Sequence, residues 1–140
     1  MIVVVDTPIW SLSLRRRPRD LNSKERQHTK VLAQLIRENR VQLLGPVRQE
    51  LLSGMRELTE FERLRDSLRA FPEPRLQSED YEEAARMSNQ CRAREIAGSA
   101  IDFLICSAAW RRGWSIFTTD ENFVRYAKIL PIRLREGEFG

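Results

Sequence analysis

The first eight residues restrict the fold more than any other part of the chain. Ile2 to Val5 form an unbroken β-branched run, which ends at the acidic residue Asp6. A strand without alternating polar residues is typical of a parallel sheet that is covered on both faces. Thr7 and Pro8 follow at once, and proline is favoured in the first turn of a helix. We therefore predict a buried strand that leads through an acid into a helix.

The rest of the chain repeats this alternation of strands and helices. Asn22 and Glu25 have capping-box spacing, which predicts a helix start. Apolar residues at helical spacing are clearest between Ile101 and Arg111. Strands are also predicted over 41–44 and 114–117, with a weak edge strand over 129–134, and helices after 45, over 61–68, from 78 and over 121–126. This order predicts an α/β fold with three layers (α/β/α) and a mainly parallel central sheet.

The composition fits one soluble globular domain that comprises residues 1–140. Hydrophobic residues make up 41% of the chain and charged residues 31%. No apolar run approaches the ~20 residues that span a bilayer, and the N-terminus has no features of a signal peptide. We therefore expect a cytoplasmic protein without membrane contact.

The charge is consistent with a nucleic-acid partner. The formal net charge is +4, and 21 of the 24 basic residues are arginine, whose planar side chain binds phosphate and stacks on bases. An arginine-rich solvated surface explains the same composition equally well.

Four acidic residues lie where this topology brings chain segments together. Asp6 and Asp120 follow the first and third predicted strands, and parallel strands end at one edge of a sheet. The helix from Ile101 rises about 16 Å, so Asp102 at its start returns to that edge. Glu50 lies about 6 Å along a helix that begins there. Each acid alone fits a helix cap or a solvated face, but the shared edge predicts one site.

Crowded carboxylates repel one another, and a divalent cation relieves that repulsion. Oxygen ligands without histidine or cysteine favour Mg²⁺ or Mn²⁺ over zinc. Such a site predicts hydrolysis of a phosphodiester by metal-activated water. The single histidine, His28, excludes a two-histidine mechanism, and the sequence has no phosphate-binding loop or serine elbow. Haloacid-dehalogenase phosphatases need a second acid two residues after the first, and this chain has Pro8 there, which argues against that class of enzyme.

Four stretches of sequence together resemble one known family. They are 3–10 (VVVDTPIW), 49–54 (QELLSG), 101–109 (IDFLICSAA) and 117–123 (FTTDENF). In this order they resemble the PIN-domain ribonucleases, and more closely the VapC-type toxins of bacterial toxin–antitoxin pairs. The resemblance covers essentially the whole chain and implies an endoribonuclease toxin with a PIN-like fold.

The resemblance also implies roles for individual residues and partners. Asp6, Asp102 and Asp120 would bind Mg²⁺ or Mn²⁺ and, with Glu50, would form the catalytic centre for RNA cleavage. Residues that would support the acids are Thr7, Thr118 and Asn122, although the two threonines fit capping and packing equally well. Asn122 departs from the family, because many members carry another acid there. The family further implies a homodimer and a cognate antitoxin that inhibits the site.

Several basic residues are candidates for substrate binding. Cations must flank an acidic site that cleaves RNA, and the candidates are Arg15, Arg16 and Arg17 (with Arg19 in the same run) and Arg92 and Arg94. Each also fits a solvated loop.

Other side chains are expected to be structural. Arg111 and Arg112 would interact with their own helix dipole, and His28 would be a solvated helix residue. The residues expected to be buried are Trp10, Trp110, Trp114, Cys91 and Cys106, and on the helix from Ser78 also Tyr81, Ala84, Ala85 and Ser88, before a loop over 92–99.

Two alternatives to an RNA-cleaving enzyme remain. One is a DNA-directed nuclease on the same scaffold. The other is a catalytically silent module that binds metal or RNA, an alternative that Asn122 keeps open because it adds no charge. Fold alone does not decide among them.

Overall fold

The computed structural model describes residues 1–135. Its centre is a three-stranded sheet in the order β2-β1-β3, formed by β1 (Val3–Val5), β2 (Val41–Gln42) and β3 (Ser115–Phe117). Both neighbours pair with β1 in parallel, and the register places Val5 opposite Phe117. The three valines of β1 are fully buried. The predicted parallel sheet is therefore confirmed, with β2 shorter than expected.

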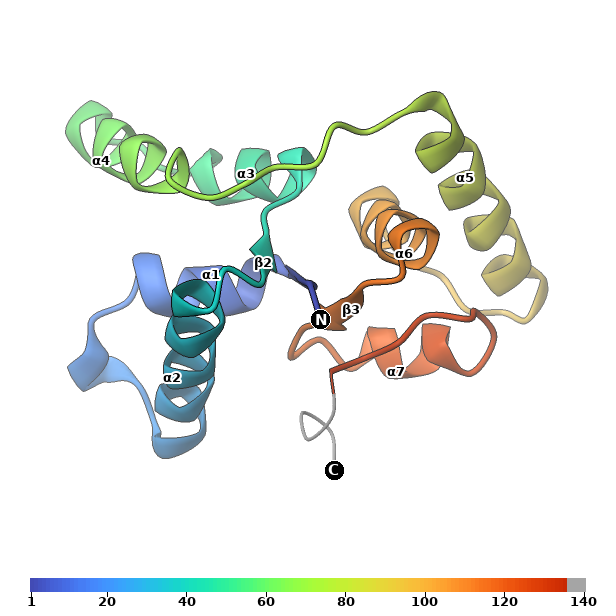
Figure 1. The fold of residues 1–140 in the computed structure, drawn as a ribbon, viewed down its shortest axis with the longest axis horizontal. Helices are drawn as coiled ribbons and strands as arrows, with labels where there is room; N and C mark the ends of the chain where they lie inside the picture. Colours follow the sequence, from blue (N-terminus) through green and yellow to red (C-terminus); the bar gives the residue numbers. More distant parts are fainter. Residues whose placement is uncertain (136–140) are drawn as a thin grey trace.

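Helices cover both faces of this sheet, as a three-layer fold requires. Figure 1 shows α1 and α2 on one side of the strands and α5, α6 and α7 on the other, with α3 and α4 beyond one end. The bounds are α1 (Thr7–Leu14), α2 (Ser23–Arg37), α3 (Gly45–Leu52), α4 (Leu58–Leu68), α5 (Ser78–Ala93), α6 (Ala100–Arg112) and α7 (Asn122–Ala127), with a short 3₁₀ turn η1 (Pro18–Asp20). In residues 1–135, no helix is long and apolar enough to cross a membrane.

Local capping signals explain where the principal helices begin and end. Asn22 and Glu25 form the expected capping box at the start of α2. The Ser99 hydroxyl accepts a hydrogen bond from the Asp102 amide (3.1 Å) at the start of α6. Gly113 ends α6 with a φ of 72°, a left-handed conformation that glycine adopts without a Cβ penalty. These contacts fix where α6 begins, in the turn that carries Asp102, and where it ends before β3.

Six expectations about the outer parts of the fold are wrong or only partly right. Tyr81 and Ala85 are exposed, because Asp80 and Met87 lie on the buried face of α5 instead. The same helix continues to Ala93, so the following loop is shorter than predicted. The segment over 129–134 contributes only one parallel bridge, between Leu134 and Ile116. Trp110 is 43% exposed and His28 is buried, whereas Trp10, Cys91 and Cys106 are buried as expected.

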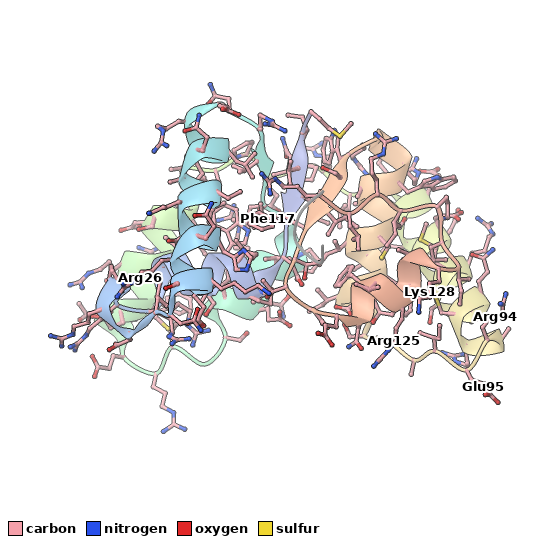
Figure 2. The ribbon with its side chains drawn as sticks, turned by 90° about the horizontal axis from the view of Figure 1, so that it is seen from below. Arg26, Arg94, Glu95, Phe117, Arg125 and Lys128 are labelled. Carbon is pink, nitrogen blue, oxygen red and sulfur yellow. The ribbon has the colours of Figure 1, made fainter. Side chains whose placement is uncertain are left out.

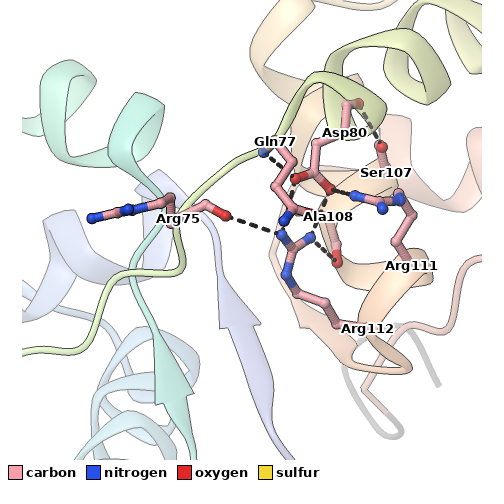
Figure 3. A network of polar contacts seen from close by, with 7 residues as sticks. All are labelled: Arg75, Gln77, Asp80, Ser107, Ala108, Arg111 and Arg112. Atoms are coloured by element: carbon pink, nitrogen blue, oxygen red, sulfur yellow. Dashed lines mark hydrogen bonds and ion pairs between the residues drawn. The ribbon is translucent and has the colours of Figure 1, made fainter.

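A buried acid joins α5 to the end of α6 (Figure 3). Asp80 is fully buried and accepts hydrogen bonds from Arg111 (2.6 Å) and Arg112 (2.7 and 2.9 Å). Its backbone carbonyl also accepts from the Ser107 hydroxyl (2.7 Å). The hydrogen bonds from Arg112 hold the Asp80 pKa well below its usual range, against the opposing effect of burial. Arg111 and Arg112 are structural, as expected, but their partner is this carboxylate.

Candidate active site

The first strand places Asp6 at the carboxyl edge of the sheet. The Asp6 amide donates to the carbonyl of Phe117 (2.9 Å), which continues the pairing of β1 with β3. The side chain caps α1, because its Oδ1 accepts from the Thr7 amide (2.8 Å). Only 4% of Asp6 is exposed. Strand pairing and helix capping therefore fix both its backbone and its carboxylate.

A threonine after β3 connects Asp6 to the last of the four acids. The Thr118 hydroxyl donates to Asp6 Oδ2 (2.7 Å) and accepts from the Asp120 amide (3.0 Å). Asp120 Oδ1 in turn accepts from the amide of Asn122 (2.9 Å) at the start of α7. Thr118 itself is buried. A single hydroxyl group thus holds the first and last acids in a fixed relationship.

The first turn of α6 brings Asp102 toward the same edge. Its carboxylate Oδ2 accepts a hydrogen bond from the hydroxyl of Tyr126 (2.6 Å) on α7. Tyr126 is fully buried, and its ring contacts the rings of Phe103 and Phe123. Sequence patterns did not identify Tyr126 as part of the site, since it occupies an apolar position of a short helix.

The charges of neighbouring acids contribute to raised pKa values of Asp6 and Asp102. Burial raises the pKa of Asp6 from 3.8 to about 6, opposed by the hydrogen bonds from Thr118 and Thr7. The negative charges of Asp102 and Asp120 raise it further. Burial also raises the pKa of Asp102, opposed by Tyr126 and Ser99, and Asp120 and Glu50 add to the increase. Asp6 and Asp102 therefore each lie within electrostatic range of Asp120.

The exposure of the acids differs. Glu50 lies near the end of α3 and is exposed, whereas Asp102 and Asp120 are half-buried. Within residues 1–135, no three acidic, histidine or cysteine side chains stand as a preformed ligand set for a metal. The donor chemistry nevertheless fits Mg²⁺ or Mn²⁺, because carboxylate oxygens are the ligands that hard divalent cations prefer. Burial and the charges of nearby acids raise the Asp6 pKa, and a bound divalent cation would offset both effects.

The three supporting residues differ in what they contact. Thr118 bonds directly to Asp6, as described above. Thr7 contacts Asp6 through its backbone amide, and its hydroxyl is buried without a hydrogen-bond partner among residues 1–135. The Asn122 side-chain oxygen accepts from Arg125 (2.9 Å), an exposed cation on α7 that the sequence patterns did not single out.

A pocket of about 440 Å³ is lined by residues that follow Asp6 and Thr118 closely in the sequence. Pro8 and Thr119, which lie close in sequence to Asp6 and Thr118, line one side of it. The other lining residues come from α1, the segment after it and the start of α2: Ser11, Leu12, Arg16, Asn22, Lys24, Glu25 and His28. The volume is within the roughly 300–1,000 Å³ range of ligand pockets. Its charged lining residues are Arg16, Lys24 and Glu25, and Glu25 lies 3.6 Å from Arg16 in an ion pair.

The candidate substrate-binding arginines lie in two separate regions. Arg15, Arg16 and Arg17 are exposed after α1, and Arg16 lies 3.6 Å from Glu25 in an ion pair. Arg92 and Arg94 are exposed at the end of α5, before the loop that leads to Asp102. Figure 2 shows Arg94, Arg125 and Lys128 on the α5–α7 side of the molecule and Arg26 on the opposite side.

The described residues form an α/β domain with acidic side chains at the carboxyl edge of a parallel sheet, which is the edge where open α/β sheets bind ligands. The family model described as PIN domain matches residues 3–129. The chain therefore belongs to the PIN-domain family, whose members are generally nucleases. A comparison with curated proteins gave no match.

Solved structures confirm the fold. VapBC2 from Rickettsia felis bound to a DNA fragment from their promoter has a TM-score of 0.76 at 14% identity, covering 96% of this chain and 98% of that one. FitAcB from Neisseria gonorrhoeae has a TM-score of 0.71 at 17% identity, covering 96% and 97%. DNA-bound VapBC from Salmonella typhimurium has a TM-score of 0.65 at 14% identity, with the same coverage of 96% and 97%.

Proposed function

We propose that the protein is a metal-dependent endoribonuclease and the toxin of a toxin–antitoxin pair. The observation that carries the catalytic part is the bridge from Asp6 through the Thr118 hydroxyl to Asp120. This bridge holds two acids beside a third, Asp102, whose charge raises the pKa of Asp6. Membership of the PIN family supports a nuclease.

Asp6, Asp102 and Asp120 would hold Mg²⁺ or Mn²⁺, with Glu50 as the fourth catalytic acid. When bound, the cation would supply positive charge that activates a water and offsets the charge on the phosphate being cleaved. The Thr7 amide and the Thr118 hydroxyl each donate a hydrogen bond to the Asp6 carboxylate, and together they fix its orientation. Glu50 is the most exposed of the four, so it is the acid best placed to move a proton to and from solvent.

Three residues would support these acids without binding the cation themselves. Thr118 orients Asp6, and its hydrogen-bond geometry is the strongest argument for any of the three. The backbone amide of Asn122 donates a hydrogen bond to the Asp120 carboxylate and so holds it in place. Thr7 contributes its amide, and its buried hydroxyl offers one more polar group beside Asp6.

RNA would reach the acids across cationic surfaces on both sides. The pocket beside Asp6 carries Arg16 and Lys24, and Arg15 and Arg17 extend this region. Arg92 and Arg94 would contact the strand on the other side, before α6. Phosphate contacts of this kind provide most of the affinity for a nucleic acid. Their exposure leaves them accessible to a flexible single strand.

The proposed toxin would form a homodimer in the cytoplasm and be inhibited by a cognate antitoxin. The fold neighbours support the antitoxin partner, because they include VapBC structures and a toxin-antitoxin complex from Klebsiella pneumoniae. The likeness to the latter has a TM-score of 0.64 at 15% identity and covers 85% of this chain and 87% of that one. Residues 1–140 would form the single domain that carries the activity.

The direct test uses the chain purified free of any antitoxin. It is incubated with total bacterial RNA in Mg²⁺, in Mn²⁺ and in chelator, beside Asp6→Asn and Asp102→Asn. We expect discrete fragments that require metal and are absent with either variant. Single-stranded RNA and DNA of one sequence, compared side by side, separate a ribonuclease from a DNA-directed nuclease. A folded, metal-binding protein that cleaves neither would instead be a silent binding module.

A further inference from the structure

The hydroxyl group of Tyr126 donates a hydrogen bond to the Asp102 carboxylate. The two oxygen atoms, Tyr126 Oη and Asp102 Oδ2, lie 2.6 Å apart. This is short for a hydroxyl donor and typical of a bond to a charged acceptor. The tyrosine comes from α7, after β3, whereas the aspartate comes from α6, before it. The contact therefore joins the two elements on either side of β3.

The Tyr126 side chain has little freedom to move. No part of the residue is exposed, and its ring centre lies 5.0 Å from that of Phe103 and 5.2 Å from that of Phe123. Its backbone carbonyl accepts a hydrogen bond from the amide of Leu130 (2.7 Å). A donor fixed in this way imposes its own position on the acceptor, which here is half-buried.

The loop before α6 leaves space for this hydroxyl group. A Cβ atom on Gly98 would overlap Tyr126 Oη and would lie 2.8 Å from Tyr126 Cζ and 2.9 Å from Phe103 Cε2. Real Cβ atoms essentially never approach other atoms so closely. Glycine at position 98 therefore allows the backbone to pass directly over the hydroxyl group that bonds to Asp102.

The Tyr126 hydroxyl group is an uncharged hydrogen-bond donor. It therefore adds no positive charge that would compete with a cation for the Asp102 carboxylate.

We propose that Tyr126 is a positioning residue that fixes the orientation of the Asp102 carboxylate for metal binding, in a space that Gly98 keeps open. The inference rests on the proposed function, since it takes Asp102 as a metal ligand. Groups that orient metal ligands typically contribute a 10–100-fold effect on metal affinity or activity.

The test measures Mn²⁺ binding by titration calorimetry, without RNA, to the full chain free of antitoxin. Tyr126→Phe keeps the buried ring and removes only the hydroxyl group. We expect it to weaken Mn²⁺ binding by about 10-fold or more, to lower kcat by a similar factor and to leave KM for RNA unchanged. Tyr81→Phe is the matched control, because it removes the hydroxyl of an exposed tyrosine on α5, and its Mn²⁺ affinity should equal that of the parent.

A second variant tests the same contact from the other side. Gly98→Ala should displace the Tyr126 hydroxyl group and weaken Mn²⁺ binding as well. Because both changes disrupt one contact, the double variant should lose less affinity than the product of the two single losses.

The outcomes separate this inference from the proposed function. Unchanged Mn²⁺ affinity in folded Tyr126→Phe, together with lost binding in Asp102→Asn, would overturn the positioning role and leave the metal site in place. Lower thermal stability of Tyr126→Phe with unchanged affinity would make the tyrosine a packing residue only. A parent protein that binds no Mn²⁺ would overturn both proposals.

Discussion

Thr118 Oγ1 lies 2.7 Å from Asp6 Oδ2, across a separation of 112 residues in the chain. The same oxygen accepts from the Asp120 amide. A hydroxyl group has one proton to donate, and here it is used on Asp6. The side chain that best connects the parts of the candidate site is therefore uncharged and almost fully buried, at 1% exposure.

Replacing Thr118 by valine should impair both catalysis and stability. Valine has nearly the same shape, but it removes the donor to Asp6 and leaves the Asp120 amide without its acceptor. We expect a loss of about 1–3 kcal/mol in the free energy of unfolding and at least about a 10-fold fall in kcat. Urea denaturation and an RNA cleavage assay measure the two effects. Thr118→Ser retains the hydroxyl and should stay close to the parent; equal losses in both variants would contradict the role of the hydroxyl.

Asp6 should make the metal-free protein less stable as the pH rises from about 4 to 6. Its pKa in the folded state is about 6 against 3.8 for an ordinary aspartate, so the folded protein binds the proton more tightly than the unfolded chain. The free energy of unfolding therefore falls through this window, and the destabilisation is complete above it. At pH 7 in chelator, Asp6→Asn should be more stable than the parent, by about 1–3 kcal/mol.

Thermal unfolding at a series of pH values checks this sign. The difference between the two proteins should vanish below about pH 3, where Asp6 is protonated in both the folded and the unfolded state. Excess Mn²⁺ should reverse the order at pH 7, because only the parent has the complete site and gains stability from binding. A parent that is more stable than Asp6→Asn in chelator at pH 7 would contradict the raised pKa.

Asp80 should stabilise the fold without contributing to the chemistry. Asp80→Asn leaves Arg111 and Arg112 partly buried without their counter-charge, and we expect a loss of about 3 kcal/mol at pH 7. The Asp80 pKa is lowered by folding, so the parent should lose this contribution as the pH falls below about 4. Urea midpoints at pH 7 and pH 3 measure both effects. Glu60→Gln, which removes an exposed ion pair with Arg63, should change stability by less than about 1 kcal/mol.

Lys24 should contribute to RNA binding at the expense of helix stability. It lies in the first turn of α2, where the helix dipole disfavours a cation by about 0.3–1 kcal/mol. Lys24→Glu should therefore raise the melting temperature slightly and increase KM for RNA. It should also reduce the slope of log RNA affinity against log salt concentration by about one. Lys30→Glu makes the same change on the same helix outside the pocket. An equal rise in KM for both variants would indicate general electrostatics, not the pocket.

The parts of the fold that depend on neighbouring residues were predictable from sequence. The buried run before Asp6, the capping box at Asn22 and the end of α6 at Gly113 all lie where expected. In each case, residues within one helical turn determine the conformation. Parallel topology also predicted that the four acids share an edge; the Thr118 hydroxyl connects two of them, Asp6 and Asp120.

Features that depend on distant contacts were not predictable. Asp80 occupies an ordinary acidic position in the first turn of a helix, and only the packing of α5 on α6 supplies its arginine partners. His28 follows a polar stretch, yet its ring lies 6.0 Å from that of Phe117 on β3. Tyr126 meets Asp102 only after the chain has passed through β3. Periodicity and capping patterns contain no information about such contacts.

The order of the strands in the sheet has a consequence for the synthesis of the protein. Among the three strands, β1 is made first and its neighbour β3 is made last. Until residues 115–120 have left the ribosome, Asp6 lacks both its partner in β3 and the Thr118 hydroxyl. The candidate site can therefore assemble only after β3 has emerged, and a shorter nascent chain would carry Asp6 without the far end of its hydrogen-bond bridge.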